Sequence, residues 1–321
     1  MMTSAFSFVY VVLGLLCLLL LLHSTESGNM TRGVFGVCSP SADFTPLDIS
    51  YTPTCFPDDP NTSRQQVGAR YVQAMQEDLE NNRKTISEGQ EDVAYEQGGQ
   101  LLDIWGPTKT VQKVFIALHG GYWNQGDRKL FTSMVGPLVE EGITVAVVSY
   151  DMATKNPLRE VIDQVKRAVT FIVDFFPDAE ISIGGHSAGG HLAALALSEL
   201  PKIDRISTLV SICGIYQLDE LAETFIGRLI HLTPEMAQNC SLDASKFVEK
   251  FGNKSIVLLN SEFDAPQLAQ QNPVLEGVLR SLGARNVRSV KIPKVDHFSI
   301  IEKLRFKNHP ATEALLGALL G

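Results

Sequence analysis

The sequence predicts an α/β fold in which a mostly parallel sheet is covered by helices on both faces. Short, almost wholly apolar runs alternate with longer segments of helical character, as expected for parallel strands joined by helices. At 321 residues the chain is long for one domain, but α/β folds often reach this size. The expected parallel strands are residues 114–118, 143–149, 181–183, 206–212, 256–260 and 287–292, and helical patterns include residues 65–82 and 267–282.

Two further segments complete this architecture. Residues 93–95 and 101–105 lie on either side of a Gly-Gly pair, which predicts an antiparallel hairpin at the sheet edge. Residues 218–251 are helical in pattern and follow a predicted strand, so we expect a small helical lid there. The folded domain is expected to span residues 65–321, after a loop-rich N-terminal extension at 28–64.

The most informative motif is Gly185-x-Ser187-x-Gly189, which lies between a predicted strand and an apolar helix. Such a corner holds a serine on a sharp turn, with its hydroxyl exposed at a helix N-terminus. We therefore interpret Ser187 as a nucleophile. The motif alone is a moderate signal, because small residues also form ordinary strand-to-helix turns.

A second motif follows the predicted strand at 114–118. His119-Gly120-Gly121 stands where an oxyanion hole is expected, since glycines let backbone N–H groups approach a substrate oxygen. We assign the donors to Gly120, Gly121 and Ala188. Losing one such donor typically costs about 3 to 4 kcal/mol of transition-state stabilisation.

A general base is expected after the serine, because in this architecture the order is serine, acid, histidine. Three histidines follow Ser187 at a distance, and His297 lies beyond the last predicted strand, at the same sheet edge as the serine. His231 falls in the predicted lid and His309 near the C-terminus. His297 is therefore the expected base.

The acid is expected at the end of the strand at 256–260. Asp264 is preferred there, with Glu262 as the alternative. Asp296 adjoins His297, but neighbouring side chains rarely present the geometry of an orienting acid, so we expect Asp296 to be solvated.

These motifs resemble the kynurenine formamidase (arylformamidase) branch of the α/β-hydrolase fold. The resemblance rests on the runs at 119–123 and 185–191 and covers roughly residues 67–320. It implies hydrolysis of N-formyl-L-kynurenine to L-kynurenine and formate without a metal or organic cofactor. Carried over by position, the family's triad falls on Ser187, Asp264 and His297. Supporting similarities lie at residues 102–107, 149–151, 214–216 and 232–235.

An aromatic substrate of this kind calls for an aromatic wall in the binding site. The candidates are Tyr122, Trp123, Tyr216 and Phe298, and each of them is equally compatible with core or loop packing. Two other functions stay open: a secreted carboxylesterase of broad specificity, and a catalytically silent binding protein with this fold. The intact serine, acid and histidine argue against the second.

Charge and composition restrict the partners. The net charge is −9 and the sequence pI is about 5.3, with no basic cluster, which argues against nucleic-acid binding. No Cys/His cluster has the spacing of a metal site, so no metal is expected. A small-molecule substrate, an aryl formamide or ester, is the expected partner.

The N-terminus predicts entry into the secretory pathway. Residues 6–22 are almost wholly apolar and lead into a small-residue cleavage region, so residues 1–27 are interpreted as a signal peptide. No Lys or Arg precedes the run, and an uncleaved membrane anchor at 6–22 is the alternative. Glycosylation sequons begin at Asn29, Asn61, Asn239 and Asn253.

Cysteine placement agrees with an oxidising compartment. Cys38 and Cys55 bracket a Pro/Ser/Thr-rich segment and could form a disulfide. Cys213 follows an apolar run and is expected to be a buried thiol, and Cys240 lies within a sequon.

Overall fold

The computed structural model describes residues 36–96 and 99–321, and an eight-stranded sheet forms its centre. The strand order is β1-β2-β4-β3-β5-β6-β7-β8. β1 and β2 form the predicted antiparallel hairpin, β2 is antiparallel to β4, and the remaining neighbours are parallel. The strands are β1 (Gly89–Ala94), β2 (Leu101–Trp105), β3 (Lys113–Leu118), β4 (Ile143–Val148), β5 (Glu180–His186), β6 (Ile206–Ile212), β7 (Ser255–Phe263) and β8 (Val287–Asp296).

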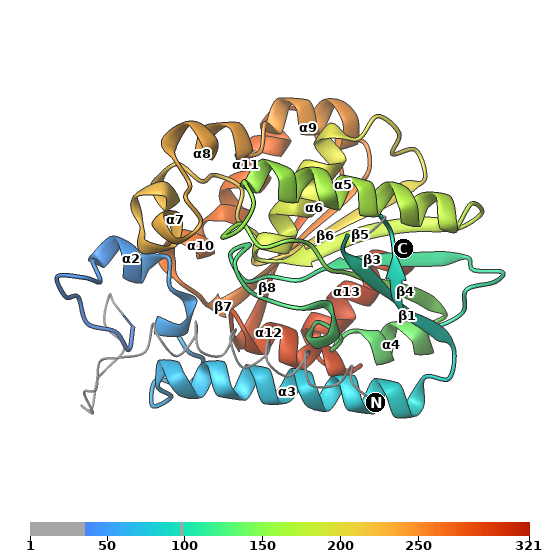
Figure 1. Cartoon of the computed structure of the whole chain (residues 1–321), viewed down its shortest axis with the longest axis horizontal. Helices are drawn as coiled ribbons and strands as arrows, with labels where there is room; N and C mark the ends of the chain where they lie inside the picture. Colours follow the sequence, from blue (N-terminus) through green and yellow to red (C-terminus); the bar gives the residue numbers. More distant parts are fainter. Residues whose placement is uncertain (1–35, 97–98) are drawn as a thin grey trace.

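Helices cover both faces of the sheet, which confirms the predicted fold class (Figure 1). One face carries α5 (Leu158–Phe175), α6 (Ala188–Glu199), α9 (Ala244–Phe251) and α11 (Gln271–Ser281). The other carries α3 (Arg64–Thr85), α4 (Val135–Glu140), α12 (Ser299–Glu302) and α13 (Pro310–Leu320). The remaining short helices are α2 (Pro46–Ser50), α7 (Phe225–Leu229), α8 (Pro234–Cys240) and α10 (Pro266–Ala269).

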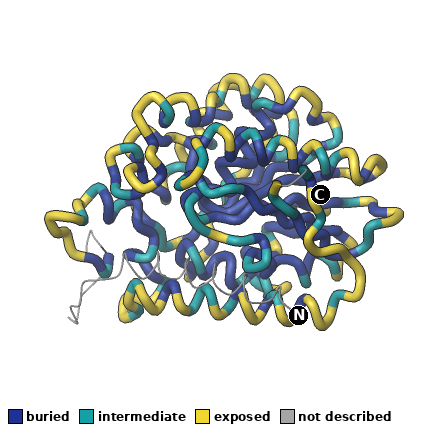
Figure 2. Tube along the Cα trace, in the orientation of Figure 1, coloured by how far each residue is buried: buried dark blue, intermediate teal, exposed yellow. Residues whose placement is uncertain are grey.

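Strand β3 shows how the sheet is buried on both sides. Val114, Ile116 and Leu118 pack into the core beneath α5, α6 and α9. Phe115 and Ala117 point the other way, into the core formed with α3, α4 and α13. Burying one such large aliphatic or aromatic side chain stabilises the fold by about 1.5–3 kcal/mol. The central strands, dark blue in Figure 2, therefore give the loops at their ends a rigid base.

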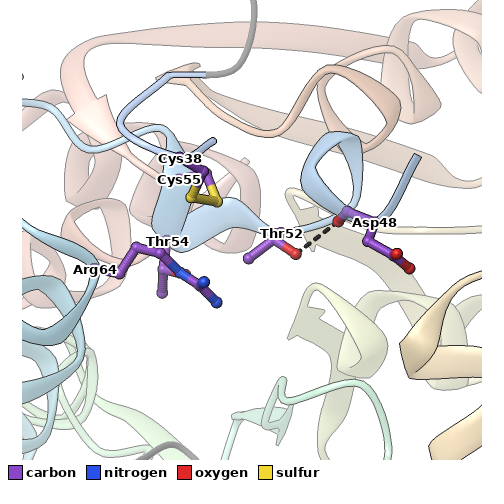
Figure 3. Close-up of a disulfide and its surroundings, with 6 residues drawn as sticks. All are labelled: Cys38, Asp48, Thr52, Thr54, Cys55 and Arg64. Atoms are coloured by element: carbon purple, nitrogen blue, oxygen red, sulfur yellow. Dashed lines mark hydrogen bonds between the residues drawn. A yellow bond between two sulfur atoms is a disulfide. The ribbon is translucent and has the colours of Figure 1, made fainter. Parts of the chain in front are cut away.

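The N-terminal extension is cross-linked as predicted. Cys38 and Cys55 form a disulfide across 17 positions of sequence (Figure 3). Beside it, the Thr52 hydroxyl donates a 2.7 Å hydrogen bond to the Asp48 carbonyl, at the end of α2. In the chain-entropy account, a cross-link of this loop length stabilises by about 3 kcal/mol. The described part of the extension, residues 36–63, is therefore a fixed part of the domain.

This extension joins the lid to the loop that follows β3. The Tyr122 hydroxyl donates to the Tyr51 carbonyl at 2.6 Å, and the Tyr51 hydroxyl donates to Glu220 at 3.2 Å. The Phe225 N–H, at the start of α7, donates to the Asp48 carboxylate at 2.7 Å. A disulfide-closed segment thus holds the lid against that loop.

The segment predicted as a lid, residues 218–251, divides into two parts. The 3₁₀ turn η3 (Glu220–Glu223), α7 and α8 precede α9, but α9 packs against α6 and α11. α9 is the crossover helix between the parallel strands β6 and β7, so it belongs to the layer on the sheet. We therefore place the end of the lid before α9.

Across residues 36–96 and 99–321, no helix combines the length and hydropathy that a bilayer crossing requires. The predicted signal peptide or anchor and the sequon at Asn29 lie outside the described residues.

Candidate active site

Ser187 occupies a sharp corner between β5 and α6, where it is 2% exposed and so more deeply buried than the sequence pattern indicates. Its backbone angles are φ 53° and ψ −117°, a strained conformation for a residue with a side chain. A Cβ on Gly185 would lie 2.3 Å from the Gly189 carbonyl carbon, and one on Gly189 would lie 2.1 Å from the Leu118 oxygen. Only glycines fit at these two positions, which explains the Gly-x-Ser-x-Gly pattern.

The loop after β3 packs directly against this corner. A Cβ on Gly120 would lie 3.2 Å from the Ser187 Cβ and 2.7 Å from Nδ1 of His186. Gly121 has a φ of 112°, which disfavours any other residue. Ala188 is the first residue of α6, so its N–H has no acceptor within the helix. The structure therefore packs Gly120 against the serine corner and places Ala188 directly after the serine, while Gly121 follows Gly120 in the same loop.

Asp264 and His297 form a buried pair at the neighbouring strand ends. Nδ1 of His297 lies 2.8 Å from Oδ2 of Asp264, and each side chain is 3% exposed. Asp264 follows β7 and His297 follows β8, and these parallel neighbours end at the same edge of the sheet. Glu262, the alternative acid, is exposed and accepts a 2.7 Å hydrogen bond from the Lys294 N–H.

The carboxylate determines what His297 can do. Burial acts to lower the pKa of His297, but the charge and hydrogen bond of Asp264 outweigh this effect, and the pKa is raised above its ordinary value. In the neutral ring, the carboxylate, which only accepts, holds the proton on Nδ1 and leaves the Nε2 lone pair free to act as a base.

His186, which the sequence reasoning did not single out, connects this pair to the serine. Its Nε2 donates a 2.9 Å hydrogen bond to the His297 carbonyl, and the two rings lie 4.5 Å apart between centroids. Burial lowers the pKa of His186 well below its ordinary value, so its ring stays neutral. In the described part of the chain, no hydrogen bond joins the Ser187 hydroxyl to His297. Such catalytic contacts often tighten only when substrate binds.

The expectation that Asp296 is solvated was wrong. Its side chain is completely buried and lies 2.9 Å from the Arg70 guanidinium, which α3 supplies. It also accepts hydrogen bonds from the N–H groups of Asp58 and Ser299. These donors compensate the burial of the charge, and they clamp the loop that carries His297. No local sequence pattern reveals this pairing, because Arg70 is 226 residues away.

Cys213 lies next to the acid and the base. It follows β6 and is buried, as predicted, with Sγ 3.4 Å from Oγ of Ser261, which in turn donates to Asp264 at 3.1 Å. Burial raises the pKa of the Cys213 thiol. Among the described residues Cys240 is also a free, buried cysteine, and its carbonyl lies 2.7 Å from Nε2 of His191.

Two of the four predicted aromatic-wall residues are core residues. Trp123 has no exposed surface and packs edge-on against His191, at 4.9 Å between ring centroids. Tyr216 is 1% exposed, and its hydroxyl lies 2.7 Å from Ser211 and from Asn272. Neither ring presents a face to a substrate in this structure.

The other two aromatic residues lie nearer the site. Tyr122 is buried, with its hydroxyl bonded to the extension at Tyr51. Phe298 retains exposed surface and packs edge-on against His297 and Tyr71, at 5.4 Å from each ring. Of the four aromatic candidates, Phe298 is thus the one best placed to contact a substrate beside His297.

Comparisons with known proteins show which sequences and structures this chain is similar to. The family profile described as BD-FAE matches residues 102–211. The kynurenine formamidase of Salmo salar is 31% identical over 258 residues, which cover 77% of this chain and 87% of that protein. The kynurenine formamidase of Danio rerio is 29% identical over 282 residues, which cover 84% of this chain and 94% of that protein. The solved structure of a hyperthermophilic esterase from the archaeon Pyrobaculum calidifontis aligns with a TM-score of 0.62 and 14% identity, covering 77% of this chain and 90% of that one.

The sheet order, the crossover helices and the structural likeness define an α/β hydrolase. The sequence identity to the salmon protein, which extends over most of both chains, defines the family within this class. The chain belongs to the kynurenine formamidase family, and it is an arylformamidase-like hydrolase.

Proposed function

We propose that this protein hydrolyses N-formyl-L-kynurenine to L-kynurenine and formate through an acyl-enzyme formed on Ser187. The observation that carries the proposal is the buried 2.8 Å pair of Asp264 and His297, held at the strand ends beside the strained serine corner. A serine is a weak nucleophile until an oriented base takes its proton. The kynurenine formamidase relatives support the choice of substrate.

In this mechanism, Oγ of Ser187 attacks the formyl carbon and its proton passes to Nε2 of His297. The N–H groups of Gly121 and Ala188 stabilise the negative charge that develops on the carbonyl oxygen. His297 then gives the proton to the arylamine nitrogen as the C–N bond breaks. Water attacks the formyl-enzyme with the same base, which releases formate and restores the serine.

The substrate assignment is tested by comparing purified protein on N-formyl-L-kynurenine and on short p-nitrophenyl esters. We expect kcat/KM to be at least about tenfold higher for the formamide, equivalent to ~1.4 kcal/mol of transition-state binding. Esters are intrinsically easier to hydrolyse, so a preference for the amide requires a site shaped for it. N-acetyl-L-kynurenine is the matched control, and its larger acyl group should react much more slowly.

A carboxylesterase of broad specificity is the competing function, since the same three residues would serve it. Faster turnover of several esters than of N-formyl-L-kynurenine would establish that function instead. Failure to hydrolyse any of these compounds would favour the silent binding protein.

We also propose that the protein enters the secretory pathway, either cleaved after residues 1–27 or retained by an anchor at 6–22. The support is the apolar N-terminal run and the Cys38–Cys55 disulfide, a bond typical of oxidising compartments. The sequon asparagines Asn61, Asn239 and Asn253 are all exposed, as glycosylation requires.

Expression in a secretory host tests this localisation. The mature chain is expected to begin near Gly28 and to lose mass on glycosidase treatment, with a smaller loss after Asn61→Gln. An intact N-terminal Met1 on a glycosylated, membrane-bound protein would establish the anchor. A soluble, unglycosylated protein that keeps Met1 would contradict entry into the pathway.

A further inference from the structure

The proposed chemistry leaves one buried thiol beside the site unused. Cys213 lies at the end of β6, and its N–H donates a 2.8 Å hydrogen bond to the Leu259 carbonyl, which fixes its backbone in place. Its φ of 49° turns the residue out of the strand direction. The thiol therefore projects from a rigid position toward the neighbouring strand end, where Ser261 and Asp264 lie.

The thiol, the acid and the base together form a metal-ligand set. A donor atom from each of Cys213, Asp264 and His297 lies within 4.8 Å of the other two. Sulfur, imidazole nitrogen and carboxylate oxygen are the ligands that Zn²⁺ takes in proteins, with bonds of about 2.0–2.3 Å. Tetrahedral bonding at those lengths separates the donors by about 3.5 Å, so small side-chain rotations suffice to close the set.

We propose that Cys213, Asp264 and His297 form an inhibitory binding site for a thiophilic divalent cation such as Zn²⁺ or Cd²⁺. The inhibition rests on the proposed function, whereas the binding stands on the donor geometry alone. Three donors from the protein leave a fourth position for water, as in open zinc sites.

The charges and protons balance. The cation takes the place of the proton that lies between Nδ1 of His297 and the Asp264 carboxylate. The Cys213 thiol loses its proton to solvent, and thiolate and carboxylate together neutralise the double positive charge. The proton displaced from Nδ1 moves to Nε2, so the imidazole has no lone pair left to accept the proton of Ser187. Binding therefore blocks the base without touching the nucleophile.

Metal titration of the purified full-length protein tests the site. We expect one equivalent of Cd²⁺ to produce a thiolate-to-metal charge-transfer band in the ultraviolet, and Zn²⁺ to compete for the same site. Cys213→Ser should remove the band and weaken metal binding at least about tenfold. Even the loss of a residue that only hydrogen-bonds a metal ligand lowers metal affinity by about 10- to 100-fold. Cys240→Ser removes the other buried free thiol of the described chain, and this variant should keep both the charge-transfer band and the metal affinity.

Hydrolysis measured in the same titration should fall in step with the band and recover on addition of EDTA. Each variant is compared with its own metal-free rate, and Cys213→Ala replaces the serine variant if thermal unfolding shows that the latter is destabilised. A band that survives in the Cys213 variants, or that disappears in Cys240→Ser, would overturn the proposal. A Cys213-dependent band on a protein without hydrolytic activity would keep the metal site and reject the proposed function.

Discussion

Replacing Ser187 by alanine is expected to lower kcat for N-formyl-L-kynurenine by about 10⁶, the loss seen when a serine hydrolase loses its nucleophile. No covalent intermediate forms without Oγ, and water must attack the formamide directly. The free energy of unfolding should change by less than about 0.5 kcal/mol, because the strained backbone is held by its neighbours and the fold gains little from the hydroxyl. Steady-state kinetics and thermal unfolding of the same sample measure both quantities.

Ser198→Ala is the matched control for this experiment. Ser198 is also buried and lies on α6, the helix that begins directly after Ser187, but it is at the far end of that helix. Its replacement should leave kcat within a few-fold of the wild type. Wild-type activity in Ser187→Ala would reject the mechanism, and a fall in melting temperature parallel to the activity would show that the fold, not the nucleophile, was lost.

The sequence was most informative about the ends of strands. In a parallel sheet the carboxyl ends of the strands share one edge, so residues that follow β5, β7 and β8 must lie near one another. This rule, together with the chain order serine, acid, histidine, predicted that Ser187, Asp264 and His297 belong to one edge. The rule does not separate Asp264 from Glu262; Asp264 was the preferred acid, and the structure pairs it with His297.

The direction in which a side chain within a loop points could not be predicted in the same way. Asp296 is next to His297, yet it turns into the core because α3, from far upstream in the chain, offers Arg70 there. Trp123 and Tyr216 are the same kinds of residue as a substrate wall would use, but their rings face the core. Residue type gives the chemistry of a side chain, and only the packing of distant elements decides which way it points.

The proposed Cys213 site has no signature in the sequence for a related reason. Metal sites are found in sequences by short spacings within one loop or helix, as in zinc fingers. Here the three donors come from the ends of β6, β7 and β8, so no spacing joins them. The segment predicted as a lid includes α9, since an amphipathic pattern fits a lid helix as well as a crossover helix on the sheet.

Asp264→Asn is expected to lower kcat by about 10⁴, as in the analogous serine-protease triad. The amide group matches the carboxylate in shape, but its NH₂ can donate to Nδ1 of His297 and so favour the tautomer that carries its proton on Nε2. In that tautomer the ring has no lone pair for the Ser187 proton. Stability should change less than activity, because the new side chain still fits and still forms a hydrogen bond.

The pH profile of Asp264→Asn gives a second readout. The base must be unprotonated to work, so kcat/KM falls as the pH drops below the pKa of His297 in the free enzyme. Asp264 raises that pKa, and removing its charge should therefore move the acid limb of the profile to lower pH while the plateau falls. Glu262→Gln is the control and should leave both features unchanged, since within the described residues Glu262 bonds to the Lys294 N–H and not to His297. A mild Asp264→Asn beside a crippled Glu262→Gln would reverse the assignment of the acid, and an unmoved acid limb would show that His297 is not the group that titrates.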